Sequence, residues 1–209
     1  MMLKLLKYIS IVISLICSNV FGQTINRYGT TAANFLEIGV GSRATSMGDA
    51  YVAVANDVSS IYWNPAGLSN VSNSSALFMV QPWLVDIDML FAGGAVVVPN
   101  VGVLGLGITH LDYGEMDVTN LEYQDGTGER FGASDMAATF TFSRKIVSWF
   151  SFGSSMKYIS SNIWHSSASA FAVDLGVLVN TKFFSFTGND KDGINIGMSI
   201  SNYGTRMQY

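Results

Sequence analysis

Hydrophobic and polar residues alternate with a period of two through much of the chain. In the stretch "ATFTFS", Phe140 and Phe142 fall on one face, and Thr139 and Thr141 fall on the other. The same alternation recurs in three later stretches, around 150–158, 171–179 and 194–200. Because successive side chains of a β-strand point to opposite faces, this period predicts strands. We therefore predict an all-β protein.

Connections between the predicted strands differ in length. We predict seven strands, at 75–83, 88–98, 101–111, 134–146, 149–161, 169–182 and 193–203. Tight turns at Pro99-Asn100 and near Val147 alternate with a long polar insertion, Asp112–Gly132, and a medium connection, Asn162–Ala168. Outer-membrane barrels show this asymmetry, with short periplasmic turns and long outer loops.

The strand count leaves alternatives open. Single-chain bacterial barrels close with an even number of strands, so seven strands indicate an incomplete chain or a missed strand. Met116–Tyr123 is one candidate for an eighth strand, and the terminal "YGTRMQY" leaves a complete eight-stranded barrel open. The stretch Phe183–Gly193 is long where a short turn is expected.

The alternation fits two kinds of protein. A soluble sandwich turns its apolar face inward, whereas a membrane barrel turns that face to lipid and lines its lumen with the polar face. The polar faces here carry Ser, Gly, Ala and Asn with few charges, which suits a crowded interior. The long strands also resemble the roughly 9 to 11 residues of a membrane strand more than the roughly 5 to 6 of a soluble one. We predict an antiparallel transmembrane β-barrel.

Strand phase assigns side chains to the two sides of this barrel. The predicted lipid-facing residues are Phe140, Phe142, Phe150, Phe152, Phe171, Val173 and Ile196. The predicted lumen-facing charges are Asp135, Lys157 and Asp174.

Composition narrows the class of partner. Only 12% of residues are charged, where a soluble domain carries about 25%. The net charge is -4 and no basic cluster is present, so we expect no nucleic-acid partner, because phosphate binding needs a Lys/Arg footprint. Membrane lipids are the partner that the low charge favours.

The N-terminus has the layout of a secretory signal peptide. Lys4 and Lys7 precede the apolar run Tyr8–Cys17, and small residues follow before Gln23. The run is shorter than the roughly 20 residues that span a bilayer, which disfavours the alternative of a membrane anchor. We predict a signal peptide at 1–22 and a mature chain without cysteine, as in an exported bacterial envelope protein.

The stretch "SSIYWNPAGLSN" interrupts the strand pattern ahead of the first strand. Asp57 or Ser59 is expected to cap a short helix through its side-chain oxygen. Asn64 precedes Pro65 and is therefore pushed out of the helical region, so the helix should end there. Gly67 is expected to permit a left-handed turn into the first strand.

The block "GVGSRATSMGDAYVAVANDVSSIYWNPAGLSN" resembles the N-terminal segment of the PorV/PorQ-like proteins of Bacteroidota, a branch of the FadL-like outer-membrane barrels. The matching residues form a hatch motif: Arg43, Met47, Gly48, Asp57, Trp63, Asn64, Pro65, Ala66 and Gly67. Asp49 departs from a second glycine that is common after Met-Gly in the family.

The resemblance implies an architecture. Residues 23–72 would form a hatch that plugs the barrel, and 73–209 would form about half of a barrel of about fourteen strands. The alternative for 57–68 is an ordinary loop and helix on a soluble sheet. If the hatch lies in the lumen, Tyr62 or Trp63 should pack on the inner wall, and Arg43 is expected to pair with Asp135 or Asp174, unless each charge is simply solvated.

No catalytic or metal pattern is visible. His110 and His165 lie in separate segments, and no acidic pair stands at ligand spacing. "GVLGLG" at 102–107 is not followed by a helix, so crowded strand glycines explain it better than a phosphate loop. We predict a protein that is not an enzyme and needs no cofactor.

Three functions remain open. Resemblance to PorV implies a type IX secretion component of the bacterial outer membrane that binds the C-terminal signal domains of secreted proteins and other secretion components. Resemblance to the wider FadL-like group implies passive uptake of hydrophobic small molecules. The third is a structural β-protein without a transport role. The hatch motif favours the first.

Overall fold

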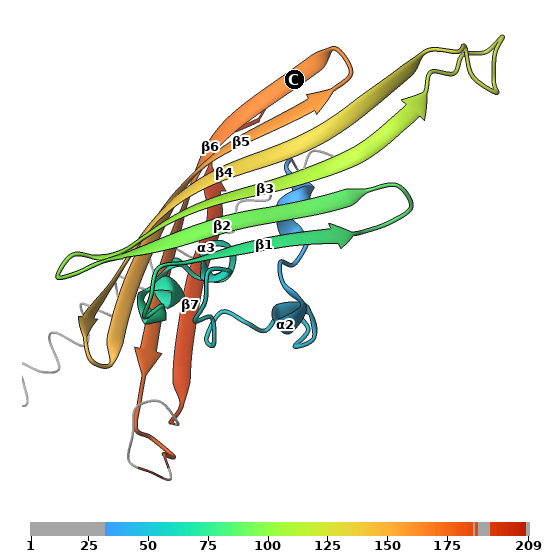
Figure 1. Cartoon of the computed structure of the whole chain (residues 1–209). Coiled ribbons are helices and arrows are strands. Elements are labelled where there is room, and N and C mark those ends of the chain that lie inside the picture. Colours follow the sequence, from blue (N-terminus) through green and yellow to red (C-terminus); the bar gives the residue numbers. More distant parts are fainter. Residues whose placement is uncertain (1–31, 186, 188–192, 208–209) are drawn as a thin grey trace, which may run out of the picture. The chain divides into compact units, whose positions relative to one another are not determined.

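The structure is a computed structural model that describes residues 32–185, 187 and 193–207; the predicted signal peptide lies outside them. It is all-β, with one antiparallel sheet whose strands follow one another in sequence order (Figure 1). The strands are β1 (Ser75–Pro82), β2 (Asp88–Val98), β3 (Gly102–Asp117), β4 (Arg130–Val147), β5 (Phe150–Ile163), β6 (Ser166–Asn180) and β7 (Asn195–Gly204). All seven predicted strands are confirmed.

Two predicted connections are wrong. The strands β3 and β4 continue through much of the predicted insertion, and the pair Asp117↔Arg130 closes their ladder. Met116 therefore belongs to β3, and 118–123 form no eighth strand. The predicted medium connection is a tight turn at Trp164-His165, with Trp164 in the left-handed region. At these strand ends polar and charged residues such as Asp112, Glu115 and Asp117 interrupt the hydrophobic alternation, so the length of the strands could not be seen in the pattern.

The sheet does not close, since β1 and β7 are the two ends of the strand order. Within the described residues the chain leaves strand geometry after Gly204, so the terminal stretch contributes no eighth strand there. None of the described helices is long and apolar enough to cross a membrane.

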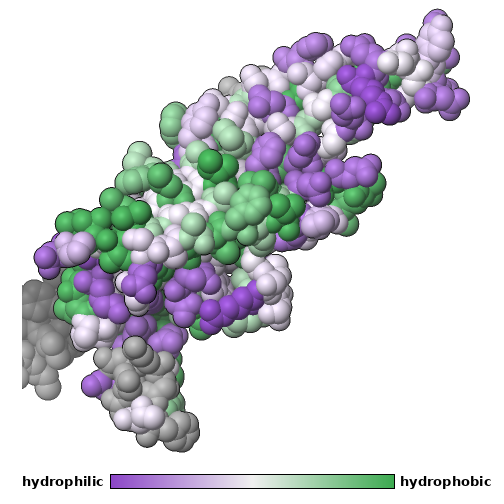
Figure 2. Space-filling view, viewed as in Figure 1, coloured by the Kyte–Doolittle hydropathy of each residue, from purple (hydrophilic) through white to green (hydrophobic). Residues whose placement is uncertain are grey.

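One face of the sheet is apolar and uncovered. The predicted outward face is confirmed: Phe171 is 62% exposed and Phe140 is 47% exposed, while Thr139 and Thr141 are buried on the other face. Figure 2 shows hydrophobic side chains gathered over the middle of the sheet, and hydrophilic ones at the far end of the β3–β4 hairpin. A large exposed apolar surface of this kind marks an interface with lipid or with another protein.

The opposite face is covered by residues 33–71, which we call the inner segment. It contains four short helical turns: η1 (Asn34–Glu37), α2 (Ser42–Thr45), α3 (Ser60–Trp63) and η2 (Pro65–Asn70). Of these, η2 lies against β3 to β6 and α3 lies against β3. Both are seen beneath the sheet in Figure 1.

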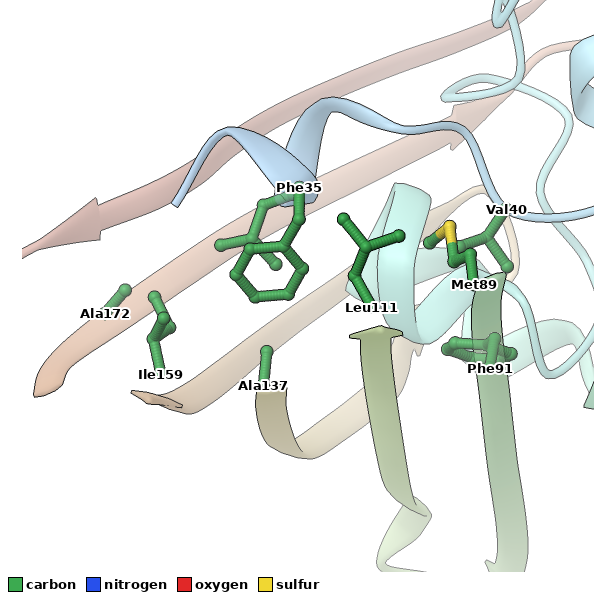
Figure 3. Packing of buried hydrophobic residues seen from close by; sticks show 9 residues of the cluster. Phe35, Val40, Met89, Phe91, Leu111, Ala137, Ile159 and Ala172 are labelled. Atoms are coloured by element: carbon green, nitrogen blue, oxygen red, sulfur yellow. The ribbon is translucent and has the colours of Figure 1, made fainter. Parts of the chain in front are cut away.

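An apolar cluster joins the start of the inner segment to the sheet (Figure 3). The segment contributes Phe35, Leu36 and Val40, and the strands contribute Met89, Phe91, Leu111, Ala137, Ile159 and Ala172. Burying a Phe or Leu side chain contributes about 1.5 to 3 kcal/mol. This cluster therefore stabilises the contact between segment and sheet. A second apolar cluster, of Val58, Ile61, Leu68, Ala95 and Val103, does the same further along the segment.

Candidate functional site

The turn before α3 is held by Asp57. Its Oδ1 accepts a hydrogen bond from the Ser59 backbone N–H at 2.9 Å, and its backbone carbonyl accepts one from the Ser60 N–H. Ser59 stands at the N-cap position but makes no side-chain cap bond, so the alternative that Ser59 caps the helix is wrong. Tyr51 donates to Asp57 Oδ2 at 3.3 Å. Burial, and next the Asp57 carboxylate, raise the pKa of Tyr51, which keeps its hydroxyl a donor.

Asn64 connects three parts of the molecule. It is extended, with φ -157°, so α3 ends as predicted, and its Oδ1 then accepts from the Ala66 N–H at 3.0 Å to cap η2. Its Nδ2 donates to the Val52 carbonyl at 2.9 Å and to the Val177 carbonyl of β6 at 3.2 Å. Asn64 is fully buried. The side-chain amide of Asn64 therefore caps η2 and binds it to the sheet, at the position where α3 ends.

The residues Asn64, Pro65, Ala66 and Gly67, which we call the anchor, lie directly on the sheet backbone. A Cβ on Gly153 of β5 would collide with the Pro65 backbone, and a Cβ on Gly176 of β6 would collide with the Asn64 side chain. Ser143 of β4 donates to the Ala66 carbonyl at 3.1 Å. Small residues at the inward phase of three strands therefore permit a contact between backbones.

Gly67 serves a purpose that the sequence did not predict. The expected left-handed turn is wrong, because Gly67 is not among the glycines with positive φ. A side chain at this position would collide with the Ala55 carbonyl. Gly67 is therefore required by the close approach of two stretches of the inner segment.

Tyr62 and Trp63 hold the inner segment together. The Tyr62 hydroxyl lies 2.7 Å from the Leu36 carbonyl and 2.9 Å from the Ile38 carbonyl, and Trp63 Nε1 donates to the Val40 carbonyl at 2.8 Å. Tyr62 also packs against the apolar cluster that the segment and the sheet share, whereas Trp63 packs within the segment. Burial, and next Asp49, raise the pKa of Tyr62.

The remaining hatch-motif residues lie away from the anchor. Arg43 Nη1 donates to Asn56 Oδ1 at 3.0 Å, and its guanidinium lies 5.5 Å from the centre of the Tyr51 ring. Met47 is exposed. Gly48 and Asp49 are both left-handed, with φ 63° and 64°, which explains why a second glycine would also fit there.

The predicted pairing of Arg43 with an inward carboxylate is wrong, although all three predicted charges do lie buried on the inner face. Asp135 accepts from the Tyr113 hydroxyl at 2.7 Å. Lys157 Nζ lies 2.8 Å from Asp174 Oδ2, without the orientation of a hydrogen bond, and donates to Asn202 Oδ1 at 2.8 Å. Lys157, on the adjacent strand β5, pairs with Asp174 instead.

Asn202 completes this network and was missed from the sequence. Its backbone N–H donates to Asp174 Oδ1 at 2.7 Å, and its φ is 58°. It lies where the β6–β7 register shifts between Val173 and Leu175. A bulge leaves one residue unpaired in the ladder, and here a side-chain carboxylate binds the freed N–H. An Asn that tolerates left-handed backbone was the one available signal.

We expect Asn64→Ala to loosen the anchor. The variant loses the η2 cap and the bond to Val177, so the free energy of unfolding should fall by about 1 to 3 kcal/mol. Urea unfolding in detergent measures the change. Asn70→Ala, at the half-buried end of η2, is the matched control; equal losses in the two variants would contradict the assigned role of Asn64.

We expect Gly153→Ala to displace the inner segment. The added methyl would meet Pro65 and Ala66 backbone atoms, and overpacking of this kind costs about 1 to 3 kcal/mol. Limited proteolysis should cut within 33–71 faster than in the parent protein. Gly94→Ala is the control, because the nearest atom to its added Cβ would be 4.0 Å away. Unchanged cleavage in Gly153→Ala would refute the close contact.

Among the described residues no group of three or more His, Cys, Asp or Glu side chains is placed to hold a metal ion. The site that the structure shows is a contact between two backbones, in which the inner segment is fixed to the inner face of the sheet.

Comparison with known families identifies the chain. The family model described as "Type IX secretion system protein PorV" matches residues 21–209. No curated protein matches the chain significantly. The matched range includes both the inner segment and all seven strands. The chain therefore belongs to the PorV family of type IX secretion system proteins.

Proposed function

We propose that this protein binds secreted cargo at the outer membrane and carries it toward the cell surface. The family is an outer-membrane component of the type IX secretion system. The observation that supports a carrier is the anchor: the inner segment is fixed to β4, β5 and β6 through the backbone contacts of 64–67. In a closed barrel, a segment fixed in this way would obstruct the lumen, which favours a role at the protein's surface over conduction.

The proposed membrane orientation follows from the two faces of the sheet. The exposed face carries Phe140, Phe171 and Ile196, whereas the covered face carries Thr141, Ser155 and the Lys157–Asp174 pair. A membrane barrel needs this inside-out arrangement, and a soluble sandwich needs its reverse. We propose that 1–22 is a signal peptide, that 23–72 is the hatch, and that further strands pair with the free edges of β1 and β7.

Tryptophans support the same orientation. The three outside the inner segment are Trp83, Trp149 and Trp164, and each stands exposed at an end of a strand. Trp is enriched at both membrane–water interfaces. We infer that Trp149 marks one interface, and that Trp83 and Trp164 mark the other.

The alternative is uptake of hydrophobic molecules. Its support is the apolar cluster around Phe35, which provides the apolar contacts that such a ligand needs. Part of the inner face is lined by small polar side chains, including Thr141, Ser143 and Ser155. The inner segment already covers the apolar residues of the sheet in both apolar clusters, so little apolar surface is left for a hydrophobic ligand. The structure therefore supports this function less well than the first.

Affinity purification of the tagged protein from its native membrane separates the functions. The proposal expects secreted proteins bearing C-terminal signal domains, together with other secretion components. Bound fatty acid or another hydrophobe without protein cargo would favour uptake. If neither protein cargo nor a hydrophobe is recovered from intact membranes, a structural role would be favoured.

A further inference from the structure

At one end of the sheet the strands β3 and β4 differ in length and form a step. There β3 begins at Gly102, whereas β4 continues to Val147. The last β3–β4 pair is Val103↔Ser143, yet β4 continues to Val147 and still pairs with β5 there. Gly102, the first residue of β3, lies beside Arg144, so the three residues after Arg144 project beyond β3 on that side. The end of the inner segment, at Ser69 and Val71, lies beneath this step.

An open depression of about 300 Å³, which we call the cavity, occupies the step. Its walls combine valines with two cations, namely Val71, Val97, Val98, Val101, Arg144 and Lys145. Val98 and Arg144 have the outward phase of their strands, whereas Val97 and Lys145 have the inward phase. The cavity therefore reaches from the apolar outer face toward the inner face, so a molecule lying against the outer face has access to it.

Both cations are exposed, and neither forms an ion pair with a carboxylate of the described residues. The turn at 148–149 follows closely, with exposed Trp149. Cations beside an interfacial Trp are placed at the level of lipid headgroups in a membrane strand.

The opposite end of the sheet has the reverse charge. The β1–β2 loop and the β3–β4 hairpin carry Asp86, Asp88, Asp112, Glu115, Asp117, Glu122, Asp125 and Glu129. Arg130, the cation there, is already bound to Glu115 at 3.2 Å and Asp117 at 3.0 Å. An anionic ligand is therefore repelled at that end and attracted at the step.

We propose that the step is a binding site for the phosphate of an anionic lipid headgroup. Arg144, on the outward phase, binds the phosphate, Lys145 adds positive charge from the inward side of the same cavity, and the valines contact the glycerol and the first methylenes. The charge supplies attraction, and the cavity supplies a fixed position that surface charge alone lacks. The site rests on the membrane orientation proposed above, with the turns at 99–101 and 148–149 on the same side of the bilayer.

The test uses the full-length protein in nanodiscs of phosphatidylcholine with and without phosphatidylglycerol. Native mass spectrometry after release from the disc counts the phosphatidylglycerol molecules that remain bound. We expect Arg144→Gln and Lys145→Gln each to weaken retention about fivefold, the effect of one cation near an anionic surface. Val101→Trp, which fills the cavity and keeps both charges, should weaken it by at least as much. Arg130→Gln, which removes one cation at the acidic end, is the matched control.

Each outcome decides the proposal. Retention that falls no further in the three variants than in Arg130→Gln would show non-specific attraction and overturn the site. Inorganic phosphate that binds the detergent-solubilised protein and displaces phosphatidylglycerol equally well would assign the site to a free anion instead. Insertion into both nanodiscs without retention overturns the lipid site and leaves the proposed orientation intact, whereas failure to insert into either defeats both.

Discussion

Lys157→Met is expected to destabilise the protein by about 3 to 5 kcal/mol, because removing one partner of a buried ion pair leaves the other charge uncompensated. Asp174 is fully buried and Lys157 is 4% exposed. The substitution keeps the volume of the side chain, so a cavity contributes little. After it, Asp174 retains a single bond, from the Asn202 N–H. Urea unfolding of the protein in detergent measures the change.

A double-mutant cycle isolates the charge term. Asp174→Asn removes the negative charge and keeps an acceptor for the Asn202 N–H. We expect Lys157→Met with Asp174→Asn to be more stable than Lys157→Met alone, since replacing both charges of a buried pair is often close to neutral. Losses that add in the double variant would show that the two side chains contribute independently.

The faces of the sheet were predictable because only the period of the pattern is needed to assign them. Phe171 and Asp174 stand three positions apart on one strand, so they fall on opposite faces wherever the strand pairs. Both assignments are confirmed. The expectation that 102–107 carries crowded strand glycines is also confirmed, since Gly105 and Gly107 face Ile61 of the inner segment.

The partner of Asp174 was not predictable. The alternation along a strand assigns each side chain to a face of the sheet, but it does not say which residue of the adjacent strand lies beside it. In the structure, Lys157 lies opposite Ala172, and Asp174 is its diagonal neighbour. That register follows from the two-residue turn at Trp164-His165, since turn length sets the register of a hairpin. With a medium loop assumed there, the register was undetermined, and Arg43 remained an open choice.

The anchor was only partly predictable. The break between Asn64 and Pro65 ended the helix as local backbone sterics require. The hydrogen bond from Asn64 to Val177 and the close contact of Gly153 with Pro65 both join residues that are more than 80 positions apart in the sequence. A local pattern contains no information about such contacts. The sequence therefore showed small residues on the inner face, but not that they make room for the backbone of the anchor.

Phe171→Arg is expected to impair membrane assembly severely, because an Arg on the lipid face near mid-membrane costs about 2 to 4 kcal/mol. Phe171 lies in the middle of the outward face of β6, packed on Tyr158 at a ring-centre distance of 5.2 Å and otherwise uncovered. In water the same substitution would replace an exposed apolar side chain at little cost, so the size of the effect reports the surrounding medium. Folding into lipid vesicles, followed by urea titration, measures it.

Asn180→Arg is the matched control for that substitution. Asn180 ends the same strand, on the inward phase and close to the turn at 148–149, with its N–H bound to the Trp149 carbonyl at 2.9 Å. A long cation there can extend its charge to water at the end of the strand, so it should be tolerated far better than one at 171. Equal tolerance of the two substitutions in vesicles would contradict the lipid-facing orientation of the apolar face, because only a hydrocarbon medium separates them by several kcal/mol.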